Sequence, residues 1–233
     1  MKTIGLIGGM SWESSKVYYE FLNRRTQELL GGSHSSKNIM LSVDFAEIEE
    51  LTFAGDWEGI GKMMAEVAQR LEKAGADVVL LCTNTIHLVS KAIEDSINIP
   101  FIHIADATAL AIQAKGLQKV ALLGTAFTME KDFYKDYIKD KYQIDVIIPM
   151  ESDRKYVHDL IYNELVKGQF TEEAKNSCLN IIEDLKAQGA EGVIMGCTEL
   201  PILIPEEEVP IPSFDTSMLH AYKAVDWVLS NND

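Results

Sequence analysis

The chain consists of two similar halves in tandem, and this duplication constrains its fold more than any other feature. Four pairs of similar segments occur in the same order at offsets between 109 and 116 residues. The pairs are Ile4–Gly8 with Val120–Gly124, Leu71–Ala76 with Leu185–Ala190, Cys82–Thr83 with Cys197–Thr198, and Asp106–Thr108 with Asp215–Ser217. Each half would hold about 115 residues, which is enough for a small domain.

Short apolar runs alternate with amphipathic stretches along both halves. The stretches Asp56–Ala74 and Thr171–Gln188 place apolar residues at helical spacing, and Gly75 and Gly189 follow them as helix ends. Several of the runs are rich in Val and Ile and lack polar interruptions, which is typical of parallel strands buried on both faces. The predicted strands are Thr3–Ile7, Ile39–Val43, Val78–Cys82, Phe101–Ile104, Val120–Leu123, Asp145–Ile148 and Gly192–Met195.

This alternation predicts an α/β fold of two similar three-layer domains with mainly parallel sheets, related by a pseudo-twofold axis. We expect residues 1–104 plus 215–233 to form the first domain and residues 105–214 the second, with the active site in the cleft between them. The segment Pro205–Pro212 reads as a surface connection.

The charge balance narrows the classes of ligand. The 21 basic and 36 acidic residues give a net charge of −15, so no basic surplus exists to bind nucleic acid or an anionic membrane surface. An acidic substrate would be repelled at long range, so its affinity has to come from short-range donors. Three cysteines cannot complete a disulfide framework, and no apolar run is long enough to span a membrane, so we expect a cytoplasmic protein.

Two Cys-Thr motifs occupy equivalent places in the halves. Cys82 and Cys197 each end a predicted strand, and open α/β sheets bind ligands at the carboxyl ends of their strands. A helix predicted from about Thr85 would bind a carboxylate at its N-terminus and lower the pKa of the thiol. Two thiols on opposite walls suit inversion of a stereocentre beside a carboxylate, because one removes the α-proton and the other delivers a proton.

Simpler interpretations exist for each candidate residue. Either thiol taken alone reads as an inert buried cysteine, and only their equivalent placement favours catalysis. Cys178 lies on the apolar stripe of its helix and reads as a core residue. His87 fits an acid–base role and a packed structural role equally well. Gly8-Gly9-Met10 predicts a tight turn, and Ser11 is expected to cap the next helix.

Three motifs carry a resemblance to a known family. Gly8–Ser11, Cys82–His87 and Gly196–Leu200 resemble segments of the cofactor-independent aspartate/glutamate racemases, and the similarity is greatest to the aspartate and broad-specificity branch. The resemblance implies two α/β domains, a homodimer, and a two-base mechanism with Cys82 and Cys197 as the catalytic pair. It implies no pyridoxal phosphate and no other cofactor.

The same resemblance implies a set of substrate-binding residues. Lys167, followed by Gly168 in a loop, would meet a side-chain carboxylate of the substrate, and Thr52 stands where some relatives carry Gln. The remaining expected substrate contacts are Met10, Thr83, Asn84, Thr85, Thr198 and Glu199. No metal site is expected, because Cys82, His87 and Cys197 would give at most three poorly matched ligands.

The sequence therefore predicts an amino-acid racemase that acts on aspartate, glutamate or a broader range of amino acids. One alternative keeps the scaffold and changes the reaction, to that of a maleate isomerase, a hydantoin racemase or a malonate decarboxylase. A second alternative is a non-catalytic protein that binds a small ligand and whose thiols are incidental.

Overall fold

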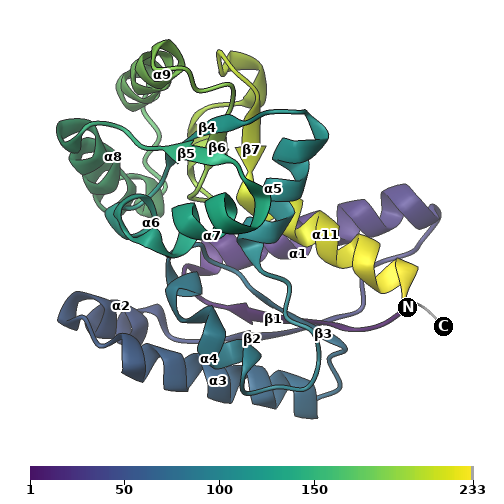
Figure 1. The fold of residues 1–233 in the computed structure, drawn as a ribbon. Coiled ribbons are helices and arrows are strands. Elements are labelled where there is room, and N and C mark those ends of the chain that lie inside the picture. The colour runs from purple at the N-terminus through teal and green to yellow at the C-terminus, as the bar shows by residue number, and fades with distance from the viewer. Residues whose placement is uncertain (232–233) are drawn as a thin grey trace. The chain divides into compact units, whose positions relative to one another are not determined.

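The chain folds into two compact units, shown in a computed structural model that describes residues 1–231 (Figure 1). The first unit consists of Met1–Ile104 and the C-terminal segment that starts at Ser217. The second unit is Ala105–Thr216. That these units form the two walls of one active site stays a prediction.

Each unit contains a parallel sheet. The first sheet has the order β2-β1-β3, with β1 (Ile4–Gly8) between β2 (Asn38–Ser42) and β3 (Val78–Leu81). The second has the order β5-β4-β6-β7, built from β4 (Lys119–Leu123), β5 (Asp145–Ile147), β6 (Val193–Met195) and β7 (Ser213–Asp215). The predicted α/β class with parallel sheets is confirmed.

The duplication in the sequence corresponds to a shared strand order. In both sheets the first strand of the half is flanked by the second strand on one side and the third on the other. Each sheet thus places the end of its third strand beside the end of its first. This arrangement brings the segment after β3 next to the segment after β1, and the segment after β6 next to the segment after β4.

The prediction of a strand at Phe101–Ile104 is wrong. Phe101 forms a single bridge with Val79, and the flanking bonds run from the Val79 N–H to the Pro100 carbonyl and from the Ile102 N–H to the Val79 carbonyl. Pairing stops there because the helix α5 (Ile104–Ala114) already begins at Ile104. In the second unit the fourth strand is β7, which the sequence patterns did not indicate.

Helices surround both sheets. The first unit contains α1 (Trp12–Leu30), α2 (Phe45–Ala54), α3 (Trp57–Lys73), the 3₁₀ helix η1 (Thr85–Val89), α4 (Ser90–Glu94) and, from its second residue, α11 (Thr216–Ser230). The second unit contains α5 from its second residue, α6 (Ala126–Glu130), α7 (Asp132–Tyr142), α8 (Glu151–Asn163), η2 (Leu165–Lys167), α9 (Glu172–Ala187), α10 (Leu200–Leu203) and η3 (Glu206–Glu208). None of the helices within residues 1–231 is both long and apolar enough to cross a membrane.

The two predicted amphipathic helices are α3 and α9. Each begins at a side-chain cap: the Asp56 carboxylate accepts the Gly59 N–H, and the Thr171 hydroxyl accepts the Ala174 N–H. Such caps satisfy backbone donors that the first helical turn leaves unpaired. Within the predicted surface connection Pro205–Pro212, the acidic residues Glu206–Glu208 form the exposed turn η3.

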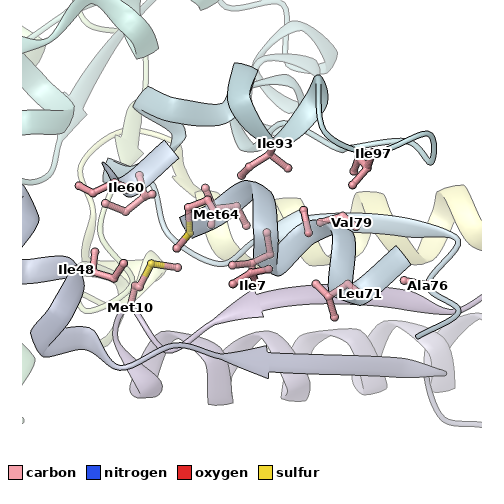
Figure 2. Close-up of a cluster of buried hydrophobic side chains, with 14 residues drawn as sticks. Ile7, Met10, Ile48, Ile60, Met64, Leu71, Ala76, Val79, Ile93 and Ile97 are labelled. Atoms are coloured by element: carbon pink, nitrogen blue, oxygen red, sulfur yellow. The ribbon is translucent and has the colours of Figure 1, made fainter. Parts of the chain in front are cut away.

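The sheet of the first unit is covered on both faces, because successive side chains of a strand point to opposite sides. On one face, Ile7 and Val79 pack with Met64 of α3 and Ile93 of α4 (Figure 2). On the other face, a second cluster joins strand residues to α1 and α11; it consists of Ile4, Leu6, Tyr18, Leu22, Val78, Leu80, Cys82, Ala221, Ala224, Val225 and Val228. The first unit is therefore a three-layer α/β structure.

The turn after β1 is packed tightly against the end of β2. Gly9 has a φ of 100°, and a Cβ built on it would lie 2.2 Å from the Val43 carbonyl oxygen. The Val43 N–H also donates to the Gly8 carbonyl at 3.0 Å. Only glycine fits this position, for both its dihedral angle and its surroundings.

Replacing Gly9 by Ala tests this packing, with Gly75→Ala as the control. Gly75 has a similar φ of 96° but open space around its Cα, so its variant carries only the conformational cost, about 1–3 kcal/mol. Gly9→Ala adds a steric clash with backbone, which typically costs about 1–3 kcal/mol more. We expect urea denaturation to give a lower free energy of unfolding for Gly9→Ala than for Gly75→Ala. Equal values would contradict the tight turn.

Candidate active site

Cys82 directly follows β3 and is held by the sheet. Its backbone N–H donates to the Ile7 carbonyl of β1 at 2.9 Å, and its side chain is completely buried in the cluster beneath α1 and α11. Burial disfavours the charged thiolate, and it raises the pKa of Cys82 well above the usual value. The thiol is therefore protonated at neutral pH.

The helix expected after Cys82 is not an α-helix. The five residues Thr85–Val89 form the 3₁₀ helix η1, and the α-helix α4 starts only at Ser90. A single 3₁₀ turn has no long row of aligned peptide dipoles, so it supplies little of the stabilisation that an α-helix gives a thiolate. The predicted lowering of the thiol pKa is wrong for this structure, because desolvation dominates.

Three of the expected substrate contacts follow Cys82 in the chain. Thr83 is half-buried and donates its N–H to the Leu81 carbonyl at 2.9 Å. Asn84 is buried, and its carbonyl accepts the His87 N–H at 3.1 Å. Thr85 is half-buried at the start of η1. These hydrogen bonds fold the segment back on itself directly beyond the strand end.

The turn after β1 depends on a residue that the sequence analysis missed. The Ser15 hydroxyl accepts the Gly9 N–H at 2.8 Å and donates to the Ser11 carbonyl at 3.1 Å. Ser11 occupies the N-cap of α1 as expected, but its hydroxyl makes no capping bond. Two serines one helical turn apart were the only signal for this arrangement in the sequence.

The Ser11 hydroxyl oxygen is buried and has no hydrogen-bond partner within the part of the chain that the structure describes. A buried hydroxyl without a partner costs about 1–3 kcal/mol. A bound ligand or water that reached this oxygen would offset that cost. Ser11 therefore joins the expected contacts as a candidate donor.

Met10 and Thr52 are each connected to Ile48 of the helix α2. The side chain of Met10 is buried and packs with Ile48, as Figure 2 shows. Thr52 is buried one helical turn after Ile48, and its hydroxyl donates to the Ile48 carbonyl at 2.7 Å. The Thr52 proton is thus already used inside its own helix, and only the oxygen lone pairs remain for another donor.

Cys197 follows β6 after Gly196, and a carboxylate lies beside it. The Cys197 thiol donates to the Glu199 carboxylate at 2.9 Å, and the Thr198 hydroxyl donates to the same oxygen at 2.7 Å. The Glu199 side chain is buried, with 4% of its surface exposed. Cys82 has no such neighbour two residues on, because Asn84 stands at the equivalent position.

The groups around Cys197 shift the pKa of its thiol in opposite directions. Cys197 is half-buried, and desolvation of its sulfur raises the pKa of the thiol well above the usual value. The charge of Glu199 and the hydrogen bond to that carboxylate raise this pKa further. The backbone N–H groups of Glu199 and Thr198 act in the other direction, because they bond the sulfur and stabilise a thiolate. The second thiol is also protonated at neutral pH, but it has an acceptor for its proton in contact.

Lys167 ends the 3₁₀ helix η2 and is exposed. Gly168 follows with a φ of 74° and turns the chain, as the sequence predicted. No ion pair joins the Lys167 ammonium to another residue among positions 1–231. The ammonium is therefore available to an anionic ligand.

Within the first unit, adjacent strand ends bring the Gly8–Ser11 turn and the Cys82–Thr85 segment to one edge of the sheet. Within the second unit, Cys197, Thr198 and Glu199 are neighbours in the chain and in space, and Lys167 lies on a separate segment. In residues 1–231 no group of three His, Cys, Asp or Glu side chains is placed to hold a metal ion.

Comparison with known proteins identifies relatives along the whole chain. The sequence profile of the Asp/Glu/hydantoin racemase family matches residues 7–224. A Yersinia pestis protein described as a candidate Asp/Glu racemase is 44% identical, with 98% of this chain and 100% of that chain covered and a TM-score of 0.93. An aspartate racemase homologue from Pyrococcus horikoshii OT3 is 33% identical, with 98% and 100% covered and a TM-score of 0.87.

A third relative has a described activity. A broad-specificity amino-acid racemase from Bacillus subtilis (strain 168) is 23% identical over 235 residues, which is 97% of this chain and 98% of that protein. These similarities extend over both compact units and over the segments that carry the two Cys-Thr motifs.

Replacing Glu199 by Gln tests the electrostatic control of Cys197. The substitution keeps the size of the side chain and removes the charge that raises the thiol pKa. We expect iodoacetamide to alkylate Cys197 about three to ten times faster at pH 8, because a lower thiol pKa leaves more of the sulfur as the reactive thiolate. Mass spectrometry of tryptic peptides follows each cysteine separately. Cys178 serves as an internal reference, because burial raises its pKa to about 12.

Thr198→Val is the matched control for that experiment. It removes a hydroxyl from the same carboxylate oxygen but leaves the charge, so it should not accelerate alkylation of Cys197. An unchanged or slower rate in Glu199→Gln would contradict the electrostatic account.

Proposed function

The chain belongs to the Asp/Glu/hydantoin racemase family, and we propose that it is an amino-acid racemase in which Cys82 and Cys197 carry the two proton transfers. Membership of the family supports an isomerase that acts on a small amino acid. The observation that carries the finer proposal is the equivalent place of the two thiols. Each follows the third strand of its half, at the carboxyl end of a buried parallel sheet.

Racemisation needs two proton-transfer groups on opposite faces of one carbon. A thiolate removes the proton from Cα, and a thiol on the other face delivers a different proton to the same carbon. The roles are then exchanged, so the enzyme is ready for the opposite enantiomer. The mechanism requires both thiols to reach one Cα.

One thiol must lose its proton before the reaction starts. Burial keeps both cysteines protonated, but Cys197 already donates to the Glu199 carboxylate at 2.9 Å. We assign to Glu199 the acceptance of that proton, with the backbone N–H groups of Thr198 and Glu199 stabilising the thiolate that remains. Cys82 has no carboxylate at the equivalent position, so it starts the cycle as the thiol.

The α-proton of an amino acid is weakly acidic, and the charge that develops on the α-carboxylate has to be stabilised. Aimed hydrogen-bond donors are typically the largest contribution to such catalysis. The segment Thr83–Thr85 and the Ser11 hydroxyl, at one sheet edge, are suited to donate to that carboxylate. Met10 and Thr52 would shape the nearby wall.

The substrate class depends on how a second carboxylate is bound. The net charge of −15 works against a dicarboxylate at long range, and the exposed ammonium of Lys167 is the local group proposed to bind one. Aspartate and glutamate are therefore the first candidates, and the similarity to a broad-specificity amino-acid racemase adds other amino acids to the substrate range to be tested. The family description also includes hydantoins, so a 5-substituted hydantoin belongs in the same substrate screen. By resemblance to the family we also propose a homodimer.

Single replacement of either catalytic cysteine tests the two-base proposal. Cys82→Ala and Cys197→Ala should each lower racemisation by at least about a thousandfold in both directions, because each direction needs one base and one acid. Circular dichroism follows each enantiomer of aspartate, glutamate, alanine and serine over time, without added cofactor and in the presence of a chelator.

Cys178→Ala is the matched control. Cys178 is buried on α9 within the core, so its replacement should lower stability slightly and leave the rate per folded molecule unchanged. Racemisation at the wild-type rate in either of the other two variants would overturn the assignment of both thiols.

A further inference from the structure

Three histidines are buried together in the first unit. His87, His103 and His220 expose 2%, 4% and 0% of their surfaces. The ring of His87 lies 4.6 Å from that of His103 and 5.9 Å from that of His220, measured between centroids, and Phe101 packs beside it at 5.7 Å. His87 contacts the segment following Cys82 through the Thr83 carbonyl.

Both ring nitrogens of His87 are occupied, and the partners define the tautomer. The Ile104 backbone N–H donates to Nε2 at 3.2 Å, so Nε2 carries a lone pair and no proton. The proton of the neutral ring then lies on Nδ1, which donates to the Thr83 carbonyl at 2.6 Å. A charged imidazolium would carry a proton at Nε2 and would lose the bond from Ile104.

The surroundings keep this ring neutral. Burial lowers the pKa of His87 well below its usual value, and His103 and His220 lower it further, whereas the bond to the Thr83 carbonyl acts in the opposite direction. With both nitrogens engaged and the ring out of water, His87 is poorly suited to exchange protons with a substrate. Of the two roles that the sequence left open, the geometry favours the structural one.

The two bonds connect functionally important points of the chain. Thr83 is adjacent to Cys82, and its carbonyl belongs to the segment proposed to bind the substrate carboxylate. Ile104 is the last residue of the first unit and the first residue of α5. His87 therefore ties the segment after the thiol to the point where the chain leaves the first unit.

We propose that His87 is a positioning residue for Cys82: its Nδ1–H holds the Thr83 carbonyl, while its Nε2 is itself anchored by the Ile104 N–H. This role rests on the proposed racemase function. A displacement of a reacting group by about 1 Å can cost a factor of about a hundred in rate. The bond to Thr83 is the one that acts on the thiol, and the bond to Ile104 fixes the ring that makes it.

His220 provides a matched control, because it is buried in the same cluster and makes two comparable bonds. Its Nε2 bonds the Ile102 carbonyl at 2.7 Å, and its Nδ1 bonds the Tyr18 hydroxyl at 2.8 Å. Neither partner belongs to the segment after Cys82. Of these bonds, replacing His87 or His220 by Leu therefore removes one buried and one part-buried hydrogen bond in either case.

The experiment compares the stability and the racemisation kinetics of these two variants with the wild type. We expect both to unfold at lower urea concentration. We expect His87→Leu alone to lower kcat per folded molecule, by about ten- to a hundredfold with a smaller change in KM, since the thiol is misplaced but the remaining substrate contacts persist. Equal losses of kcat in the two variants would overturn the positioning role.

Two conservative variants separate the bonds and remain informative if His87→Leu fails to fold. In His87→Asn the side-chain amide nitrogen takes the place of Nδ1 and can still donate to Thr83. In His87→Gln the longer side chain places its oxygen near the position of Nε2, where it can accept from Ile104. We expect His87→Asn to retain most of kcat and His87→Gln to retain less; the reverse order would overturn the assignment to the Thr83 bond.

The ¹⁵N resonances of the imidazole give a readout that does not depend on activity. We expect the wild-type His87 ring to show a protonated Nδ1 and an unprotonated Nε2 between about pH 6 and 8, because its pKa is lowered. The opposite tautomer, or an imidazolium, would overturn the proposal even in an active enzyme. If the expected tautomer is present but the wild type racemises no amino acid or hydantoin, the proposed function fails, and the role of His87 in it fails for that separate reason.

Discussion

Removing a cysteine side chain from water disfavours its charged thiolate form. The mechanism depends on how this desolvation cost is offset at Cys82 and Cys197. Both residues sit just beyond buried parallel strands, where the sheet fixes the backbone but also desolvates the sulfur. The backbone at Cys82 is held in place by the hydrogen bond from its N–H to the neighbouring strand. The position at the end of the sheet therefore both places the sulfur accurately and raises the pKa of its thiol. A proton acceptor is needed to offset this raised pKa.

The two halves place different residues around their thiols, although their strand orders correspond. In the second half a buried carboxylate, Glu199, contacts the thiol of Cys197 directly. In the first half Asn84 stands at that position, and the notable neighbour is a neutral histidine, His87, bonded to the segment after Cys82. We infer that the second half, through Glu199, controls the protonation of its thiol, whereas the first half, through His87, controls the position of its thiol.

Local patterns in the sequence predicted the duplication, the parallel strands other than β7, and the amphipathic helices α3 and α9, because these depend on periodicity and caps. The remaining features depend on tertiary contacts. Phe101–Ile104 has a strand-like composition, but a helix starts at its last residue. The 3₁₀ form of Thr85–Val89, the bond from Ser15 to the Gly9 turn, and the carboxylate against Cys197 follow from packing that no short segment encodes.

The fate of the α-hydrogen tests the two-thiol account most directly. L-Aspartate or L-glutamate deuterated at Cα is incubated with the enzyme in ordinary water, and both enantiomers are analysed by mass spectrometry early in the reaction. Two bases predict a D-enantiomer that carries a solvent proton, whereas the remaining L-enantiomer keeps its deuterium. A D-enantiomer that retains the deuterium would show that a single group moves the hydrogen between faces, and it would contradict the account.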